Sequence, residues 1–284
     1  MLGALTDPLV YGFFQRSLVA AIFVGLVCSV VGSFMVLRGL AFMGDAISHS
    51  AFPGVVAAYL LKGPFYLGAV VAAVGTALAI GWIGRRGNLR GDTVIGVLFA
   101  GMFSLGVFLF STIRNYVGDL FGFLFGEILG ISPTDLLALS ILAGIVLVIV
   151  ALLWKELLYS TFDPLGAAAS GLPVVALDYL FLALIAMTIV VSLQAVGIIL
   201  VVAMLVTPAA TAQLLTLRFG RLIGIAVLIG VASPVVGLYL SYWLNSASGA
   251  TIVLVETAIF LVALLLGPRT GVFRARHAAV EPSA

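Results

Sequence analysis

Charge is scarce in this sequence. Only 8% of the 284 residues are charged and 63% are hydrophobic, with a mean hydropathy of +1.32, whereas about a quarter of an ordinary soluble domain is charged. So few polar side chains could not cover a surface in water, which predicts an integral membrane protein. Continuous apolar runs such as residues 137–154 lack the alternation of barrel strands. We therefore expect an all-α, polytopic membrane protein.

Residues that other function classes need are also missing. The single cysteine, Cys28, excludes a disulfide framework. The two lysines, Lys62 and Lys155, stand outside any GxxxxGK[ST] loop, so energy from ATP would have to come from another subunit. No GxSxG, HExxH or CxxC pattern occurs, and no basic patch for nucleic acid. Adjacent helical residues point about 100° apart, so Ser48 and His49 cannot form a nucleophile–base pair. We expect a transport subunit, not an enzyme.

Nine apolar runs are long enough to cross a bilayer, which takes about 17 to 25 helical residues. They cover residues 18–37, 45–61, 64–84, 93–113, 134–154, 177–193, 196–216, 222–243 and 250–267. The second and sixth runs are short and the break at 194–195 is weak, so eight and nine spans both stay open. We expect one membrane domain over 1–284, with residues 1–17 and 269–284 flanking its spans.

Basic residues indicate which loops face the cytoplasm. They occur in three clusters and one longer loop, at Arg85, Arg86 and Arg90, at Arg218 and Arg221, at Arg269, Arg274 and Arg276, and at Lys155. All four regions can lie inside if residues 114–133 stay on the outer side without a full crossing. That topology puts Arg38 and the C-terminus inside and the N-terminus outside.

Residues 118–130, GDLFGFLFGEILG, carry a glycine at every fourth position, namely Gly118, Gly122, Gly126 and Gly130. On a helix these glycines share one face, where another helix backbone can approach closely. Thirteen residues at a rise of about 1.5 Å are too short to span, so we expect a half-helix or re-entrant element. Packing within the subunit and a role in a dimer interface or gate both fit this row.

Residues 161–173, TFDPLGAAASGLP, predict a short helix in a cytoplasmic loop. Asp163 fits the N-cap, Pro164 the first helical position, and Gly171 the left-handed position beyond the end. Leu165 and Gly166 would form its first turn. The helix is either an amphipathic turn at the membrane surface or a docking helix for a cytoplasmic partner.

Ionisable residues at membrane depth are costly, so each is a candidate functional residue. Asp45 and His49, in GDAISHSAFPG at 44–54, stand out because they form a pair. Residues i and i+4 share a helix face with Cβ atoms roughly 6 Å apart. A carboxylate and an imidazole at this separation can chelate one divalent first-row metal ion. A buried Asp–His hydrogen bond that fixes one helix against another is the alternative.

Two ligands are too few for a tight metal site. A second copy of the chain could supply two more, and incomplete ligation suits a site that must release its ion. Ser48 adds a nearby hydroxyl, and Glu256, deep in the last apolar run, is a possible accessory ligand. Pro53 and Gly54 follow the pair and are typical of loosened helices, where transporters place binding groups.

The chain resembles the metal-ion class of ABC importer permeases, the membrane subunits for zinc, manganese or iron(II). The resemblance covers about residues 14 to 268. It rests on GSFMVLRGLAFMGDAISHSAFPGVVAAYLL, NLRGDTVIGVLFAGMFSLGVFLFS, LFGEIL, TFDPLGAAASGLPVVALDYL and QAVGIILVVAMLVTPAATAQLL. The first and last blocks are highly specific, whereas the glycine-rich middle blocks alone would be weak.

The resemblance implies a bacterial cytoplasmic-membrane permease that transports a divalent metal ion as substrate, with no permanently bound cofactor. Its partners would be two cytoplasmic ATPase subunits, a second permease copy or a paralogue, and an extracytoplasmic metal-binding protein. It also implies that Asp45 and His49 line the translocation site and that the helix from Pro164 to about Ser170 is the coupling helix. Glu256 departs from the more apolar last span of the family. The alternative function is an ATP-independent transporter of metal ions or small metabolites.

Overall fold

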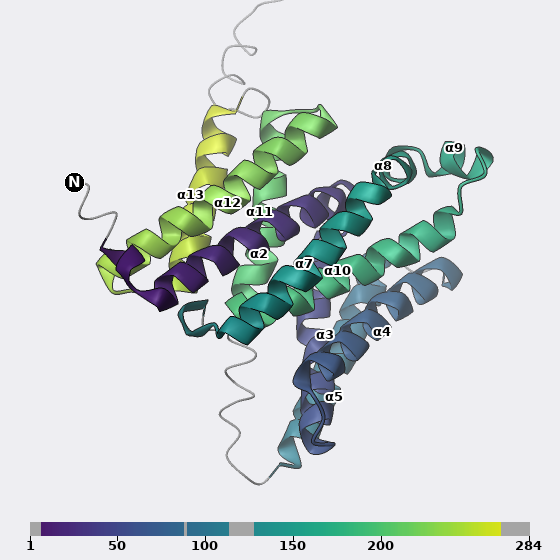
Figure 1. Cartoon of the computed structure of the whole chain (residues 1–284). Helices are drawn as coiled ribbons and strands as arrows, with labels where there is room; N and C mark the ends of the chain where they lie inside the picture. Colours follow the sequence, from purple (N-terminus) through teal and green to yellow (C-terminus); the bar gives the residue numbers. More distant parts are fainter. Residues whose placement is uncertain (1–6, 88–89, 114–127, 268–284) are drawn as a thin grey trace, which may run out of the picture.

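The computed structural model describes residues 7–87, 90–113 and 128–267, and these residues form helices without any strand (Figure 1). The nine long helices are α2 (Gly12–Leu37), α3 (Ala41–Leu60), α4 (Phe65–Arg86), α5 (Gly91–Ser111), α7 (Pro133–Leu152), α10 (Val174–Val196), α11 (Ile198–Leu215), α12 (Phe219–Leu244) and α13 (Ser248–Leu266). The short elements are η1 (Pro8–Val10), η2 (Ile128–Gly130), α8 (Trp154–Phe162) and α9 (Pro164–Ala169). The predicted all-α polytopic fold is confirmed.

Eight of the long helices in the described part of the chain are apolar and long enough to cross a membrane. The ninth is α3, whose 20 residues extend about 30 Å, which is also a spanning length. Its two ionisable residues, Asp45 and His49, lower its hydropathy. The break expected at 194–195 does not occur there, because these residues lie inside α10; Gly197, at φ 81°, separates α10 from α11 instead.

Most helix ends lie within four residues of the expected runs, and two larger differences stand out. Helix α2 begins at Gly12, not at residue 18, so part of the flanking segment 1–17 is helical. Its first turns are anchored because Phe14 is fully buried against the edge of Tyr239, and Ser17 donates a hydrogen bond to the carbonyl of Ile128. The second difference is α8, a helix in the segment expected to be a polar loop.

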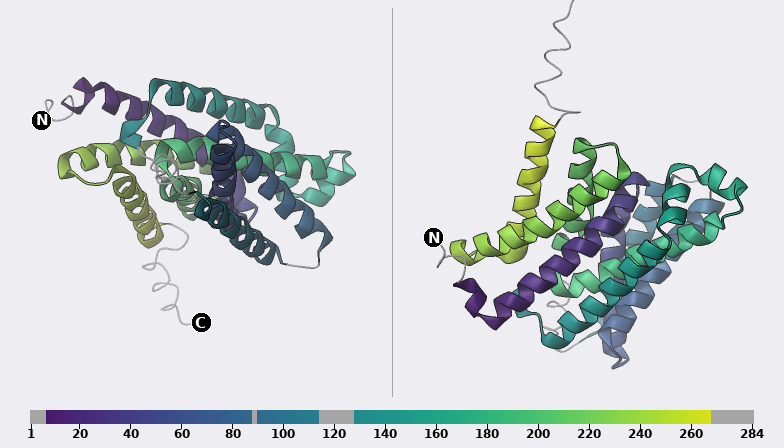
Figure 2. Two further views of the ribbon diagram at one scale, coloured as in Figure 1. Left: turned by 90° about the horizontal axis from the view of Figure 1, so that it is seen from below. Right: turned by 45° about the horizontal axis from the view of Figure 1, so that its top comes forward.

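Small residues allow the helices to pack closely. Helix α2 lies at the centre and contacts α7, α10, α11 and α12, while α3, α4 and α5 form a second group (Figures 1 and 2). A Cβ atom at Gly25 would overlap the carbonyl oxygen of Gly230, and one at Gly54 would overlap that of Gly68. Helices α10 and α11 contact both groups, which makes the bundle continuous.

The two ends of the bundle contain the loops that the sequence assigned to them. One end holds the start of α2, η2 and the connection from α12 to α13. The other end holds Arg38, Arg85 and the projecting helices α8 and α9 (Figure 1). Residues 114–127 lie outside the described residues, and with them the predicted half-helix and its glycines Gly118, Gly122 and Gly126. Gly130 ends the 3-10 helix η2.

Candidate functional site

Asp45 and His49 lie on the same face of α3. The distance from His49 Nε2 to Asp45 Oδ1 is 3.5 Å, and the side chains are 28% (His49) and 52% (Asp45) exposed. His49 is eight residues into α3, about 12 Å from its first residue, so the pair sits well inside the length of the helix. The two groups are close enough to bind one ion together, and neither is sealed from an incoming ligand.

Helix α5 holds the imidazole of His49 in place. The rings of Phe99 and Phe103 approach His49 edge-on, with centroids 5.3 and 5.4 Å away. Phe99 and Phe103 are one turn apart on α5 and are themselves stacked. Such contacts restrict the ring orientation and leave the side that faces Asp45 open. The sequence analysis did not identify these phenylalanines, although their spacing of four in an apolar helix is a signal for one shared face.

The hydroxyls near the pair are directed into α3 itself. Ser48 is fully buried and donates to the carbonyl of Gly44, and Ser50 donates to that of Ala46. Helix α3 also continues without interruption through Pro53 and Gly54. Gly54 is the point of closest approach to α4, so its small size serves packing. The accessory role of Ser48 stays a prediction.

Glu256 is not brought to the pair. It is fully buried on α13, and α11, which contacts both α3 and α13, lies between the two regions. Among the described residues no group of three or more His, Cys, Asp or Glu side chains could hold a metal ion. On one chain the pair would therefore offer only two ligands to an ion, and its role as a metal site, like that of Glu256 as accessory ligand, stays a prediction.

An ion network, which the sequence analysis did not anticipate, joins four helices at the α9 end. Arg38, just after α2, donates to Asp178 of α10 at 2.9 Å and to Thr161 and Ser160 of α8 at 2.9 and 3.0 Å. Arg85 of α4 also pairs with Asp178. Burial lowers the pKa of Arg38, and the neighbouring carboxylate opposes that shift. The network ties the loop before α9 to the spanning helices.

Helix α9 has both predicted caps. Asp163 accepts a hydrogen bond from the backbone of Gly166, and Gly171 adopts a positive φ of 84°. The backbone N–H groups of Gly171 and Leu172 then bond back to Ala168 and Ala167, the pattern that closes a helix after a left-handed residue. The end of this short helix is thereby well defined, and its Leu165 side chain is 85% exposed.

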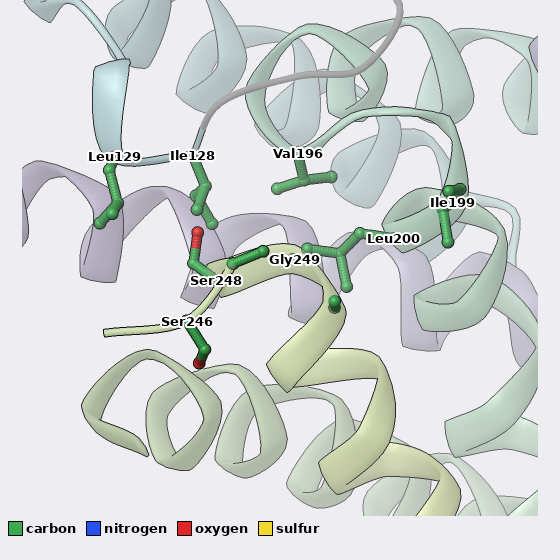
Figure 3. A pocket seen from close by; sticks show the side chains of 10 residues that line it. Ile128, Leu129, Val196, Ile199, Leu200, Ser246, Ser248 and Gly249 are labelled. Atoms are coloured by element: carbon green, nitrogen blue, oxygen red, sulfur yellow. The ribbon is translucent and has the colours of Figure 1, made fainter. Parts of the chain in front are cut away.

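A pocket of about 360 Å³ lies at the opposite end of the bundle (Figure 3). It is formed by η2, the junction of α10 and α11, and the start of α13. Ile128, Leu129 and Leu200 give it an apolar lining, and Ser246 of the α12–α13 connection and Ser248 at the start of α13 add hydroxyls (Figure 3). None of the described residues that line it has an ionisable side chain.

A model of the ABC 3 transport family matches residues 10–267. The chain belongs to this family. The resemblance drawn from the GDAISH block and the later blocks is thus confirmed, and the chain is a multi-pass membrane permease of the ABC type. The match covers all nine long helices and α9, so it includes Asp45, His49 and Glu256.

Relatives and a solved structure agree with this assignment. The chain is 46% identical to the manganese transport system membrane protein MntC of Halalkalibacterium halodurans, over 92% of this chain and 90% of that protein. It is 41% identical to the chelated iron transport system membrane protein YfeD of Yersinia pestis, over 92% and 88%. The structure of PsaBC from Streptococcus pneumoniae in complex with Fab has a TM-score of 0.86 and 36% identity, covering 97% of this chain and 100% of that one.

Proposed function

We propose that the chain is the membrane-spanning subunit of an ATP-driven importer that carries a divalent transition-metal ion into the cytoplasm. The ion binds transiently between Asp45 and His49 and is then released inward. The observation that carries this proposal is the 3.5 Å approach of an imidazole nitrogen and a carboxylate oxygen on one open helix face inside the membrane-spanning part. Two ligands are enough to pass an ion along and too few to retain it.

A second permease subunit is needed to complete the site. Asp45 is 52% exposed within a spanning helix, and a carboxylate facing lipid at that depth costs several kcal/mol, about 2.5–3.5 on insertion scales. A second copy related by two-fold symmetry would cover this face and bring a second Asp–His pair toward the ion, giving four ligands. A paralogous permease with the same motif would serve equally.

ATPase subunits would act on the end that holds α9. Leu165 projects from α9 into the surroundings, and the Arg38 network connects the preceding loop to α2, α4 and α10. A push on α9 would thus reach α4 and α10, which pack against α3 and its Asp45–His49 pair. The proposed orientation places this end and the C-terminus in the cytoplasm, in line with its excess of arginine, and the pocket of Figure 3 on the side of the metal-binding protein.

Manganese and iron(II) are the proposed substrates, since the relatives are named for manganese and chelated-iron transport. A carboxylate–imidazole pair suits manganese, iron and zinc alike, so the residues themselves do not choose. Substrate choice would be measured as competition: uptake of radiolabelled manganese in the presence of increasing iron(II) or zinc.

Metal uptake by cells that lack other manganese importers tests the proposal. Asp45→Asn should reduce manganese uptake more than about tenfold, because even loss of a group that only supports a metal ligand costs 10–100-fold in affinity or activity. Asp92→Asn, which removes an exposed carboxylate from the first turn of α5, is the matched control and should leave uptake near normal. Near-normal uptake by Asp45→Asn at wild-type membrane levels would contradict the proposed site.

ATP dependence needs its own test, because an ATP-independent transporter is the alternative. Leu165→Asp on α9 should abolish vanadate-sensitive uptake and weaken co-purification with the ATPase, while metal protection of the permease in thermal melts persists. Uptake that continues without any ATPase subunit would favour the alternative.

A further inference from the structure

Four oxygen atoms are buried without a hydrogen-bond partner in the described part of the bundle. They are both carboxyl oxygens of Glu256 and the hydroxyl oxygens of Ser29 and Ser233. All three side chains belong to residues with 0% exposure. Orphaned buried polar atoms are rare in folded proteins, and each costs about 1–3 kcal/mol, or more when charged. Four such unpaired oxygen atoms near one depth of the bundle therefore require an explanation.

The helix register brings these groups to neighbouring turns near one depth of the bundle, which we call the layer. Helices α12 and α13 form an antiparallel hairpin in which a Cβ at Gly237 would lie 2.6 Å from the side chain of Ile252. One turn further in the same direction, α12 presents Ser233 and α13 presents Glu256. One turn beyond Ser233 on α12, Gly230 touches the hydroxyl oxygen of Ser29 on α2. Glu256 is near the midpoint of α13, so this layer lies near the membrane centre.

Among the residues that the structure describes, no positive side chain pairs with Glu256. Helix α11 and η2, which pack against α13, contain no titratable residue. Helix α12 has Arg221, Tyr239 and Tyr242, none of them within a turn of Ser233. The titratable group of α2 next to Ser29 is Cys28, whose thiol contacts the hydroxyl of Ser192 on α10. An ionised carboxylate here would be an unpaired charge in hydrocarbon.

The packing around the layer limits what can neutralise the carboxylate. Backbone and side-chain atoms already touch at Gly230 and Gly237, and a Cβ at Gly25 would overlap the backbone of Gly230. A hydrated metal ion needs space between these helices, whereas a proton needs none. The charge is therefore most simply removed by protonation, which is also how buried carboxyl groups generally avoid the cost of ionisation.

We propose that Glu256, with Ser29 and Ser233, forms an intramembrane proton-binding site that is separate from the Asp45–His49 pair and is sealed in this conformation. The carboxylic acid is an O–H donor for the serine hydroxyls or for a water molecule once the helices loosen. Its proton can leave only when α13 parts from α11 and α12, the helices packed against it, and water reaches the layer. Protonation thus stabilises the sealed arrangement of these three helices.

Infrared spectroscopy of the full chain in lipid bilayers tests the protonation state directly. The difference between wild type and Glu256→Gln at neutral pH should contain the carbonyl band of one protonated carboxylic acid, exchanging slowly in deuterated water. Loss of an ionised carboxylate band instead would overturn the proposal. If that carboxylate state also depended on added sodium, the layer would be a site for a metal cation.

Two further variants keep the test decisive. Glu256→Asp should move the acid band to a different frequency, which guards against a folding failure of Glu256→Gln. Asp92→Asn, on an exposed residue, should remove only an ionised carboxylate band.

Thermal stability gives an independent test. The melting temperature of wild type should fall as pH rises above about 4.3, the ordinary pKa of glutamate, because unfolding then releases a proton that the folded state holds. Glu256→Gln should lack this component, and parallel curves for the two proteins would contradict the sealed site.

Discussion

The chain places ionisable residues at membrane depth in two regions that differ in exposure and pairing. On α3, Asp45 and His49 lie 3.5 Å apart and remain open to their surroundings. On α13, Glu256 is fully enclosed and has no partner among the described residues. An open pair is suited to receive an ion and to be completed by another subunit. A sealed single acid is suited to hold a proton. The exposure of the side chains therefore distinguishes two roles that the residue types alone would not distinguish.

The largest expected effect is chemical crosslinking of two copies of the chain at the open Asp45–His49 pair. Because the native Cys28 is buried, Asp45→Cys creates an exposed thiol in a chain that otherwise has none. If two copies meet at this face, a short bifunctional thiol reagent should convert most of the protein to covalent dimers in membranes. Val71→Cys, at a 68% exposed position on α4, is the control and should give few dimers. Equal dimer yields from both variants would argue against a shared site.

The sealed region can be tested by adding one methyl group. At Gly230 a Cβ would overlap the Ser29 hydroxyl, whereas at Gly224 on the same helix no atom lies within 4 Å. Gly230→Ala should destabilise the protein by about 1–3 kcal/mol through overpacking, and Gly224→Ala should be neutral or slightly stabilising. Melting temperatures in detergent measure the difference. Similar values for both would show that α2 and α12 are not closely packed around Glu256.

A smaller effect is expected where α5 orients the histidine. Phe103→Ala removes one of two edge-on contacts to His49, and such aromatic contacts contribute about 0.5–1.5 kcal/mol. Manganese uptake should fall about 2- to 12-fold at low metal concentration. Phe108→Ala, at a 66% exposed position on α5, should have little effect. An unchanged uptake for Phe103→Ala would mean that the ring position does not depend on α5.

The smallest expected effect is on the pH dependence of metal uptake, which should distinguish the Asp45–His49 pair from Glu256. Metal ligation needs a neutral imidazole, so uptake should decline on acidification. Glu256→Gln should retain this acid-side decline, since it leaves the pair on α3 intact, while changing the stability profile at higher pH. If Glu256→Gln abolished the acid-side decline, the two regions would not be independent.

Much of this architecture was predictable from the sequence. Apolar runs predict all nine long helices, because a spanning segment must be both apolar and self-bonded, and the caps of α9 follow from Asp163, Pro164 and Gly171. The Asp45–His49 pair also follows from helical spacing. The start of α2 could not be predicted from the sequence, because Phe14 is buried by tyrosines of α12 that are distant in the chain.

Contacts between distant helices account for what was missed. The network of Arg38, Asp178 and Arg85 joins residues from three helices, and no local pattern pairs them. The contact of His49 with Phe99 and Phe103 needs the packing of α3 on α5. Sequence likewise identifies Glu256 as unusual but cannot show that it lies apart from the pair.

The central claim is that Asp45 and His49 act as one ion-binding unit. A double-mutant cycle on manganese uptake, with Asp45→Asn, His49→Gln and both together at matched membrane levels, tests it most directly. Each single variant should lose more than about tenfold, and the double variant should be little worse than either, because removing one ligand already breaks the chelate. Losses that simply multiply, or near-normal uptake in any of the three, would contradict the account.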